Sequence, residues 1–243
     1  MIESLYEPFK HWSEMSGVFI LSDTHFNDSD CKLMDKNWIS VDEQVDRINK
    51  LVHKNDTLII LGDVGDTRYI SRLKAGYKVL VMGNHDTGRS NFERKIITKR
   101  FSKDMYTRED ALNKMKEDYP DCKYSVSEEY DFHSPFESWV ISADNKLFDE
   151  VYEGPLMIGE KIFLSHEPIL GIDWCLNIHG HDHSGKKIDN YHLNLASNVC
   201  NYTPLSLGEY IKTHGLNKIK SLHRDTIDTA TFKKAKKVAK KKT

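Results

Sequence analysis

Short apolar runs alternate with polar turns along the first half of the chain. Three four-residue runs predict buried strands, at 18–21, 58–61 and 79–82. Between the first two, apolar residues recur at helical spacing as far as Val52. This helix begins at Ser40, which forms a capping-box pattern with Glu43. A shorter helix is expected at 69–74. The order strand, helix, strand, helix, strand is typical of a largely parallel sheet.

The pattern weakens between Thr87 and Asp149, where residues 107–119 predict a helix. Beyond this segment we expect a hairpin, two further strands and a closing helix, at 155–158 with 161–164, 174–178, 192–197 and 205–214. No internal repeat or Pro/Gly linker divides the chain. The sequence therefore predicts one domain over 1–230 with 87–149 as an inserted cap, followed by a basic tail at 231–243.

Composition fits a soluble globular protein of 243 residues, with 39% hydrophobic and 30% charged side chains. The longest apolar runs are too short to span a bilayer, and the N-terminal region lacks the apolar stretch of a signal peptide. Four cysteines form no CxxC pair and show no disulfide-framework spacing. We therefore expect a cytoplasmic protein with free thiols and no membrane partner.

The net charge of −2 hides an asymmetry, because Lys233 to Lys242 holds seven lysines and no acid. Such a tail is typical of a solvated end, and the alternative is a tether to nucleic acid or to a membrane surface. Only Phe232 offers an aromatic ring beside the lysines, so stacking on bases is not indicated. We favour the solvated end.

Side chains that bind metals follow five of the predicted strands. They are Asp23 and His25, Asp63 and Asp66, Asn84 and His85, His166, and His181 and His183. Imidazole nitrogens and carboxylate or amide oxygens suit manganese, iron, zinc or nickel. Such ligands hold two divalent cations when one carboxylate bridges them. Cations about 3.5–4 Å apart bind both an attacking water and the phosphoryl oxygens in a displacement at phosphorus.

The motifs DxH, GDxxD, GNHD, SH and GHxH resemble, in order and spacing, those of the calcineurin-like metallophosphoesterases. They run from Asp23 to His183, about two thirds of the chain. The resemblance implies an α/β fold, a four-layer α/β/β/α sandwich with two mixed sheets. It also implies a dinuclear metal site at the C-terminal edge of the strands.

The resemblance also implies a role for each residue of the motifs. The first metal would be bound by Asp23, His25 and His183, and the second by Asn84, His166 and His181, with Asp63 bridging the two. The catalytic residues would be His85, which protonates the leaving oxygen, and Asp66, which orients His85. A carboxylate partner fixes the tautomer of an imidazole and raises its basicity.

Two departures from the family pattern concern the substrate. Thr67 follows Asp66, where the family's phosphoprotein phosphatases have arginine, and Arg68 comes one residue later. The chain also has GNHD where those enzymes have GNHE. Both departures argue against a protein phosphatase and favour the compact bacterial and phage-type phosphoesterases, often phosphodiesterases. The long segment after His85 suggests a cap that selects substrate. Arg89 and Arg94 are candidate phosphate contacts there, although solvated loop residues are the simpler interpretation.

We therefore expect a phosphoesterase with two divalent metal ions, manganese first and iron, zinc or nickel as alternatives. It would hydrolyse phosphodiesters ahead of monoesters, by attack of a metal-activated hydroxide with His85 as general acid. The expected substrate is a phosphoester small molecule or a nucleotide. A nuclease and a cyclic-nucleotide phosphodiesterase are alternatives that use the same site. A non-catalytic binding scaffold is disfavoured, because such relatives typically lack the histidine that His85 supplies.

Overall fold

The computed structural model describes residues 17–120, 122–130, 137–159 and 161–219. Its largest sheet has the strand order β12-β1-β2-β3-β7. Four parallel strands form most of it, namely β1 (Val18–Leu21), β2 (Thr57–Ile60), β3 (Tyr77–Val81) and β7 (Glu150–Tyr152). The short β12 (Leu205–Ser206) pairs antiparallel with β1. The three strands predicted in the first half of the chain are confirmed.

A second sheet has the order β11-β10-β9-β8. The predicted hairpin is present as β8 (Leu156–Gly159) and β9 (Ile162–Leu164), which pair antiparallel. Parallel to β9 lie β10 (Leu176–His179) and β11 (His192–Asn194). Both sheets are therefore mixed, as expected.

The two sheets share one hydrophobic core. Alternate residues of the first sheet, including Ile20, Ile59 and Val79, pack with Leu164 and Ile178 of the second. The residues between them face the other way and pack against helix α3 (Val41–Leu51). Because both faces are covered, every residue of β2 is buried and reads as a continuous apolar run.

The helices of this body follow the predicted boundaries closely. The Ser40 hydroxyl accepts a hydrogen bond from the Glu43 backbone N–H and begins α3, whereas the Glu43 carboxylate binds Arg47. The predicted short helix is a 3₁₀ helix, η1 (Thr67–Arg72). The closing helix, α5 (Leu207–His214), contacts β1 and β12. The four-layer arrangement stays a prediction.

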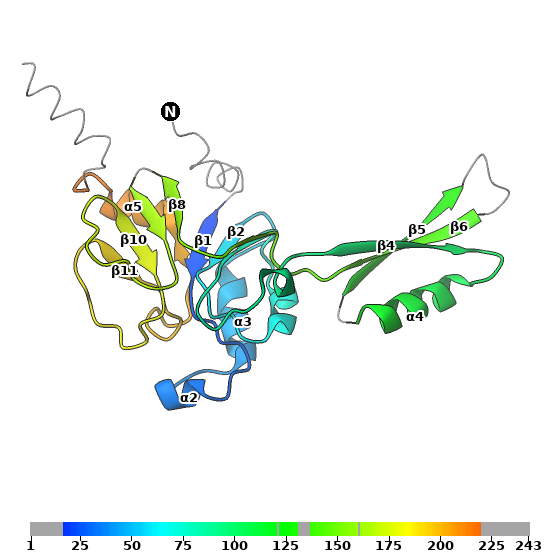
Figure 1. Ribbon diagram of the computed structural model, residues 1–243, viewed down its shortest axis with the longest axis horizontal. Coiled ribbons are helices and arrows are strands. Elements are labelled where there is room, and N and C mark those ends of the chain that lie inside the picture. Colours follow the sequence, from blue (N-terminus) through cyan, green and yellow to red (C-terminus); the bar gives the residue numbers. More distant parts are fainter. Residues whose placement is uncertain (1–16, 121, 131–136, 160, 220–243) are drawn as a thin grey trace, which may run out of the picture.

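The segment between Thr87 and Asp149 forms a third sheet with its own core. The short 3₁₀ helix η2 (Arg89–Asn91) precedes it. The third sheet has the strand order β4-β6-β5. Its strands are antiparallel, namely β4 (Ile96–Ser102), β5 (Lys123–Tyr130) and β6 (Glu137–Asp144). Helix α4 (Arg108–Asp118), which was predicted, covers one face through Ala111 and Met115. Figure 1 shows this arm projecting sideways from the two-sheet body. Its role as a cap stays a prediction.

Arg94 holds the base of the arm. Its guanidinium lies 2.7 Å from a carboxylate oxygen of Asp144 and 2.6 Å from one of Asp149. Burial alone would raise the pKa of Asp144, but Arg94 and Lys146 hold this pKa well below its usual range. Arg89 pairs with Glu93 at 2.7 Å. Arg94 is therefore an ion-pair anchor of the arm.

None of the helices in the described ranges is long and apolar enough to cross a membrane. The cytoplasmic location stays a prediction. The basic tail at 231–243 lies outside the described residues.

Candidate metal centre

The predicted ligands lie just beyond the carboxyl ends of five strands. Four of them adopt a left-handed backbone that residues other than glycine rarely enter: Asp23 (φ 54°), His25 (φ 39°), Asp63 (φ 50°) and His181 (φ 65°). In this conformation the chain turns sharply where each strand ends. Such strained turns persist where the surrounding fold holds them, and they are frequent at functional sites.

The ligands form two groups. Asp23, His25 and His183 each offer one ligand atom, and these three atoms lie within 4.8 Å of one another; the same holds for Asp63, His166 and His181. Asn84 extends the second group, because its Oδ1 lies 2.9 Å from His166 Nε2 and 3.1 Å from His181 Nδ1. The structure thus brings together all seven predicted metal ligands.

Asp63 lies between the two groups. Its Oδ2 is 3.3 Å from His166 Nε2, in the second group, and 3.6 Å from His25 Nε2, in the first. The side chain is almost fully buried. A carboxylate in this position is able to bridge two cations.

Two buried ligand atoms have no hydrogen-bond partner among the described residues, namely Asp23 Oδ1 and His25 Nε2. Leaving a buried polar atom unpaired costs about 1–3 kcal/mol, so such atoms are rare without a purpose. In the second group His166 Nε2 and His181 Nδ1 lie 3.2 Å apart. Clustered nitrogen and oxygen lone pairs with few donors fit divalent cations.

The charges of the site favour a cation as well. Burial acts to lower the pKa of His166, but the carboxylates of Asp63 and Asp23 outweigh it and raise this pKa to about 9. Burial likewise acts to raise the pKa of Asp63, while the hydrogen bonds from His166 and the His85 backbone bring it below the usual value. The site thus stabilises positive charge at its centre.

The family model for calcineurin-like phosphoesterases matches residues 17–195. The chain belongs to this family. Membership implies metal-dependent hydrolysis of phosphoesters, in agreement with the two ligand groups. A solved structure of a protein of unknown function from Aquifex aeolicus is similar to the chain, with a TM-score of 0.46 and 20% sequence identity. The match covers 81% of this chain and 98% of that one. No curated protein is significantly similar in sequence.

Two glycines of the calcineurin-like motifs are required by close packing. A Cβ atom on Gly180 would lie 2.1 Å from Asp23 Oδ2, and one on Gly83 would lie 2.3 Å from Asp63 Oδ1. Neither distance is possible between nonbonded atoms. The glycines of GHxH and GNHD therefore let neighbouring strand ends approach the metal-binding carboxylates.

Asp86 supports the calcineurin-like site and was not among the residues predicted from sequence. Its carboxylate accepts hydrogen bonds from the backbone N–H groups of Asp63 (2.9 Å), Val64 (3.0 Å) and Gly83 (2.9 Å). Asp86 therefore ties the turn after β2 to the turn after β3. The sequence feature that could have identified Asp86 is the aspartate that ends the GNHD motif.

Two further residues orient histidine ligands. Asn198 Oδ1 lies 3.0 Å from His183 Nδ1, and its amide donates to the His183 carbonyl oxygen at 3.0 Å. Asp28 Oδ2 lies 3.2 Å from His25 Nδ1. In both cases the bound Nδ1 leaves Nε2 free to face the centre of the site, as is usual for histidine ligands.

The two predicted catalytic residues are placed differently. His85 is exposed at the edge of the site, with Nε2 3.9 Å from Asp63 Oδ2, and its backbone N–H donates to Asp63 Oδ1. Asp66 begins η1 and binds Arg68 with both carboxylate oxygens. In the part of the chain that the structure describes, the Asp66 carboxylate accepts from Arg68 and Asn27 and from no histidine. Its orienting role stays a prediction.

Proposed function

We propose that the chain hydrolyses phosphodiesters, and phosphomonoesters more slowly, at a dinuclear metal centre. The observation that carries this proposal is the position of Asp63 between two ligand groups, with His25 Nε2 on one side and His166 Nε2 on the other. A single-metal site needs no shared carboxylate and no second cluster. Two ligand groups joined by a carboxylate are the arrangement that a dinuclear phosphoesterase requires.

The first ion would be held by Asp23, His25 and His183, and the second by Asn84, His166 and His181, with Asp63 shared. All seven donor atoms are nitrogen or oxygen, and we propose manganese as the ion, ahead of iron, zinc and nickel. When bound, two such cations lower the pKa of a water molecule and neutralise charge on the phosphoryl oxygens. The carboxylates of Asp23 and Asp63 keep the net charge of the loaded site low.

His85 is the proton donor in this proposal. Its exposed ring lies at the edge of the site, while its backbone is fixed by the hydrogen bond to Asp63 Oδ1. A proton on the ring would pass to the leaving alkoxide as its bond to phosphorus breaks. A positioned acid matters most when the leaving group is a poor one, such as an alkoxide, and least for a nitrophenolate.

Hydrolysis of bis-p-nitrophenyl phosphate and p-nitrophenyl phosphate tests the proposal. The protein is stripped of metal and reloaded with Mn²⁺, and the two esters are compared at equal concentration. We expect Mn²⁺-dependent hydrolysis with preference for the diester. Two bound metals with no turnover of either ester would contradict the proposal.

His85→Ala tests the proton donor, with an alkyl nitrophenyl diester and a dialkyl diester as substrates. We expect metal to stay bound, and loss of roughly a hundredfold for the alkoxide leaving group with a smaller loss for the nitrophenolate. His53→Ala is the matched control, because His53 is an exposed histidine after α3. Equal losses for both leaving groups would remove His85 from the acid role.

A further inference from the structure

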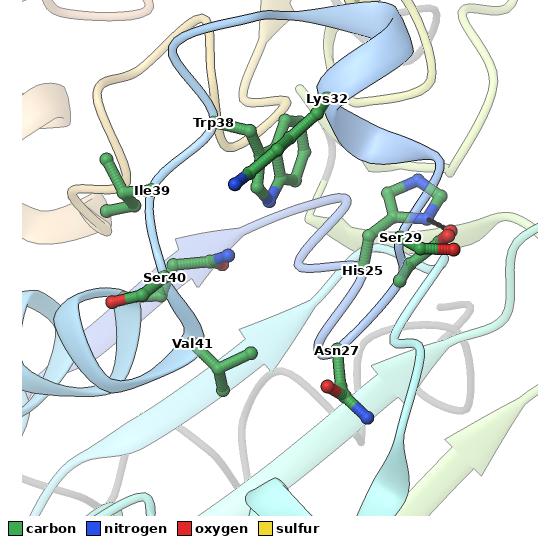
Figure 2. A pocket seen from close by; sticks show the side chains of 10 residues that line it. His25, Asn27, Ser29, Lys32, Trp38, Ile39, Ser40 and Val41 are labelled. Atoms are coloured by element: carbon green, nitrogen blue, oxygen red, sulfur yellow. Dashed lines mark hydrogen bonds and ion pairs between the residues drawn. The ribbon is translucent and has the colours of Figure 1, made fainter.

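Two cavities lie beside the metal-binding side chains. One has a volume of about 420 Å³ and is lined by His25, Lys32 and Trp38 among others; we call it the Lys32 pocket (Figure 2). The other has a volume of about 530 Å³ and is lined by Asn84, His166 and Leu170 among others; we call it the Leu170 pocket. Each cavity thus begins at a different ligand group.

Lys32 supplies a positive charge to its pocket. It lies on α2 (Cys31–Met34), and Figure 2 shows its side chain extending from this helix over the pocket. The side chain of Cys31 is fully buried and fixes α2 to the body. Lys32 forms no ion pair with any of the described residues. Its ammonium group is therefore available to an anion that enters the pocket.

The polar groups that line the Lys32 pocket include one acid, and it is not paired with Lys32. The acid in its lining is Asp28, whose carboxylate is bound by His25 Nδ1 and by the Asp30 backbone N–H. The side chains of Asn27 and Ser29 also line the pocket and offer hydrogen-bonding groups. An anion in this pocket therefore meets a lysine whose charge no neighbouring acid already binds.

Trp38 connects the pocket to the first ligand group. Its ring lies 5.9 Å from that of His25 and 5.8 Å from that of His183, centroid to centroid, and only 7% of the residue is exposed. This wall of the pocket is thus buried and continuous with two proposed metal ligands. A substituent on a phosphoryl group bound near His25 would extend directly along this wall.

The Leu170 pocket has the opposite character. Its lining residues include the acids Glu153 and Glu167 together with the apolar Met82 and Pro168. Leu170 itself is 71% exposed. Two acids in a cavity without a lysine or arginine repel an anionic group. A substrate with one anionic substituent is therefore directed to the Lys32 side.

We propose that the substrate is an asymmetric phosphodiester whose anionic substituent, a carboxylate or a phosphate, lies in the Lys32 pocket. Lys32 is then the residue that selects this substituent. The proposal rests on the proposed phosphodiester hydrolysis and goes further by naming the substrate class. A charge-assisted hydrogen bond from Lys32 corresponds to a preference of roughly tenfold for the anionic substituent.

The test compares kcat/KM of the Mn²⁺-loaded protein on matched pairs of diesters. One pair is 2-carboxyethyl p-nitrophenyl phosphate and its methyl ester, which share a leaving group and differ by one charge. A second pair is 2-phosphonoethyl p-nitrophenyl phosphate and the same diester with its phosphonate group dimethylated. This pair distinguishes a phosphate-like anion from a carboxylate. We expect the wild type to prefer the charged member of at least one pair roughly tenfold, mainly through a lower KM.

Variants assign the preference to a residue. In Lys32→Ala the ratio of charged to neutral ester should fall to about one, and in Lys32→Glu below one. Lys36→Ala is the control, because Lys36 is an exposed lysine just after α2 and outside the pocket lining. A wild type that hydrolyses both members of each pair equally well overturns the proposal. So does a Lys36 variant that lowers the ratio as much as the Lys32 variant.

The same measurements distinguish an error in the proposed phosphodiester hydrolysis from an error in the assignment of the Lys32 pocket. If the Mn²⁺-loaded wild type hydrolyses no member of either pair and does not hydrolyse bis-p-nitrophenyl phosphate, then the proposed phosphodiester hydrolysis is wrong, and the assignment of the pocket falls with it. If the diesters with an uncharged substituent are hydrolysed and the charge of the substituent does not change kcat/KM, only the assignment of the pocket is wrong.

Discussion

Four residues at the strand ends supply metal-binding atoms from a backbone conformation that residues other than glycine rarely adopt. Asp23, His25, Asp63 and His181 place ligand atoms at one point, and each does so from a left-handed backbone that its side chain disfavours. Hydrogen bonds hold these turns, such as the partly buried one from the His181 N–H to Asp23 Oδ2 at 2.9 Å. The cost in local conformation is thus offset by a network that the ligands themselves help to form.

Loss of the shared carboxylate should empty the centre. In Asp63→Ala both ligand groups lose their common oxygen, so we expect bound Mn²⁺ to fall from two ions per chain toward none and hydrolysis to fall by at least about a hundredfold. Elemental analysis after gel filtration measures the stoichiometry. The exposed Asp46→Ala serves as control. Retention of two tightly bound ions in Asp63→Ala would show that Asp63 is not the bridge.

The strands of the body and the strands of the arm differ in what covers their faces. The strands of the first sheet are buried on both faces and pack against α3 or the second sheet. The arm instead buries one face of its sheet under α4, around Phe101, Met115 and Ile141. Its other face is exposed and rich in serine and charged side chains. The arm therefore has a small core of its own and is tied at its base by Arg94.

Removal of the anchor should loosen the arm and leave the body intact. In Arg94→Ala the carboxylates of Asp144 and Asp149 lose their shared cation. Asp144 keeps its ion pair with Lys146, whereas the partly buried Asp149 carboxylate keeps a backbone hydrogen bond from Lys78, and a partly buried charge without its partner is costly. We expect amide hydrogen exchange to become faster in β4, β5 and β6 and to stay unchanged in β1, β2 and β3. Mass spectrometry of the exchanged peptides measures both.

Arg89→Ala is the matched control for this experiment, because Arg89 pairs with Glu93 at the surface, where an ion pair contributes little. Equal acceleration of exchange in the two variants would mean that the paired carboxylates do not anchor the arm.

At the scale of the molecule, the proposed centre joins the two sheets of the body. The first group combines Asp23 and His25, beyond β1, with His183, beyond β10. The second combines Asp63, beyond β2, with His166 and His181 from the other sheet. Each bound ion would therefore add a link between strand ends of the two sheets, beside their shared apolar core and hydrogen bonds such as that from the His181 N–H to Asp23 Oδ2.

Metal binding should accordingly stabilise the whole body against heat. Ligand at about a thousandfold its Kd adds about 4 kcal/mol, which for a domain of this size corresponds to roughly 10 °C in Tm. Scanning calorimetry of the stripped protein with and without Mn²⁺ measures the shift. Asp63→Ala should show little shift under the same conditions. A Tm that does not respond to Mn²⁺ would exclude a site that spans the two sheets.

The sequence predicted the body well because buried parallel strands leave a strong pattern. Runs such as Leu58 to Leu61 have few alternative interpretations, and the polar motifs that follow them mark one edge of the sheets. The strands of the arm were not predicted. Only one of their faces is buried, and Ser, Thr, Lys and Glu occupy many of their positions. The role of Asp86 was not predicted, because its hydrogen-bond partners are backbone N–H groups and their positions cannot be read from the sequence.

Because the arm has a core of its own, substitutions in the arm and at the strand ends have different structural consequences. At the strand ends even an added methyl group on Gly83 or Gly180 would collide with a carboxylate. In the arm, substitutions on the exposed face of β4 and β5 affect only solvated side chains and surface contacts such as the Arg100–Glu129 ion pair. Natural variation should therefore concentrate in the arm, where new surfaces can arise by point mutation or exchange of the whole unit without disturbing a single metal ligand.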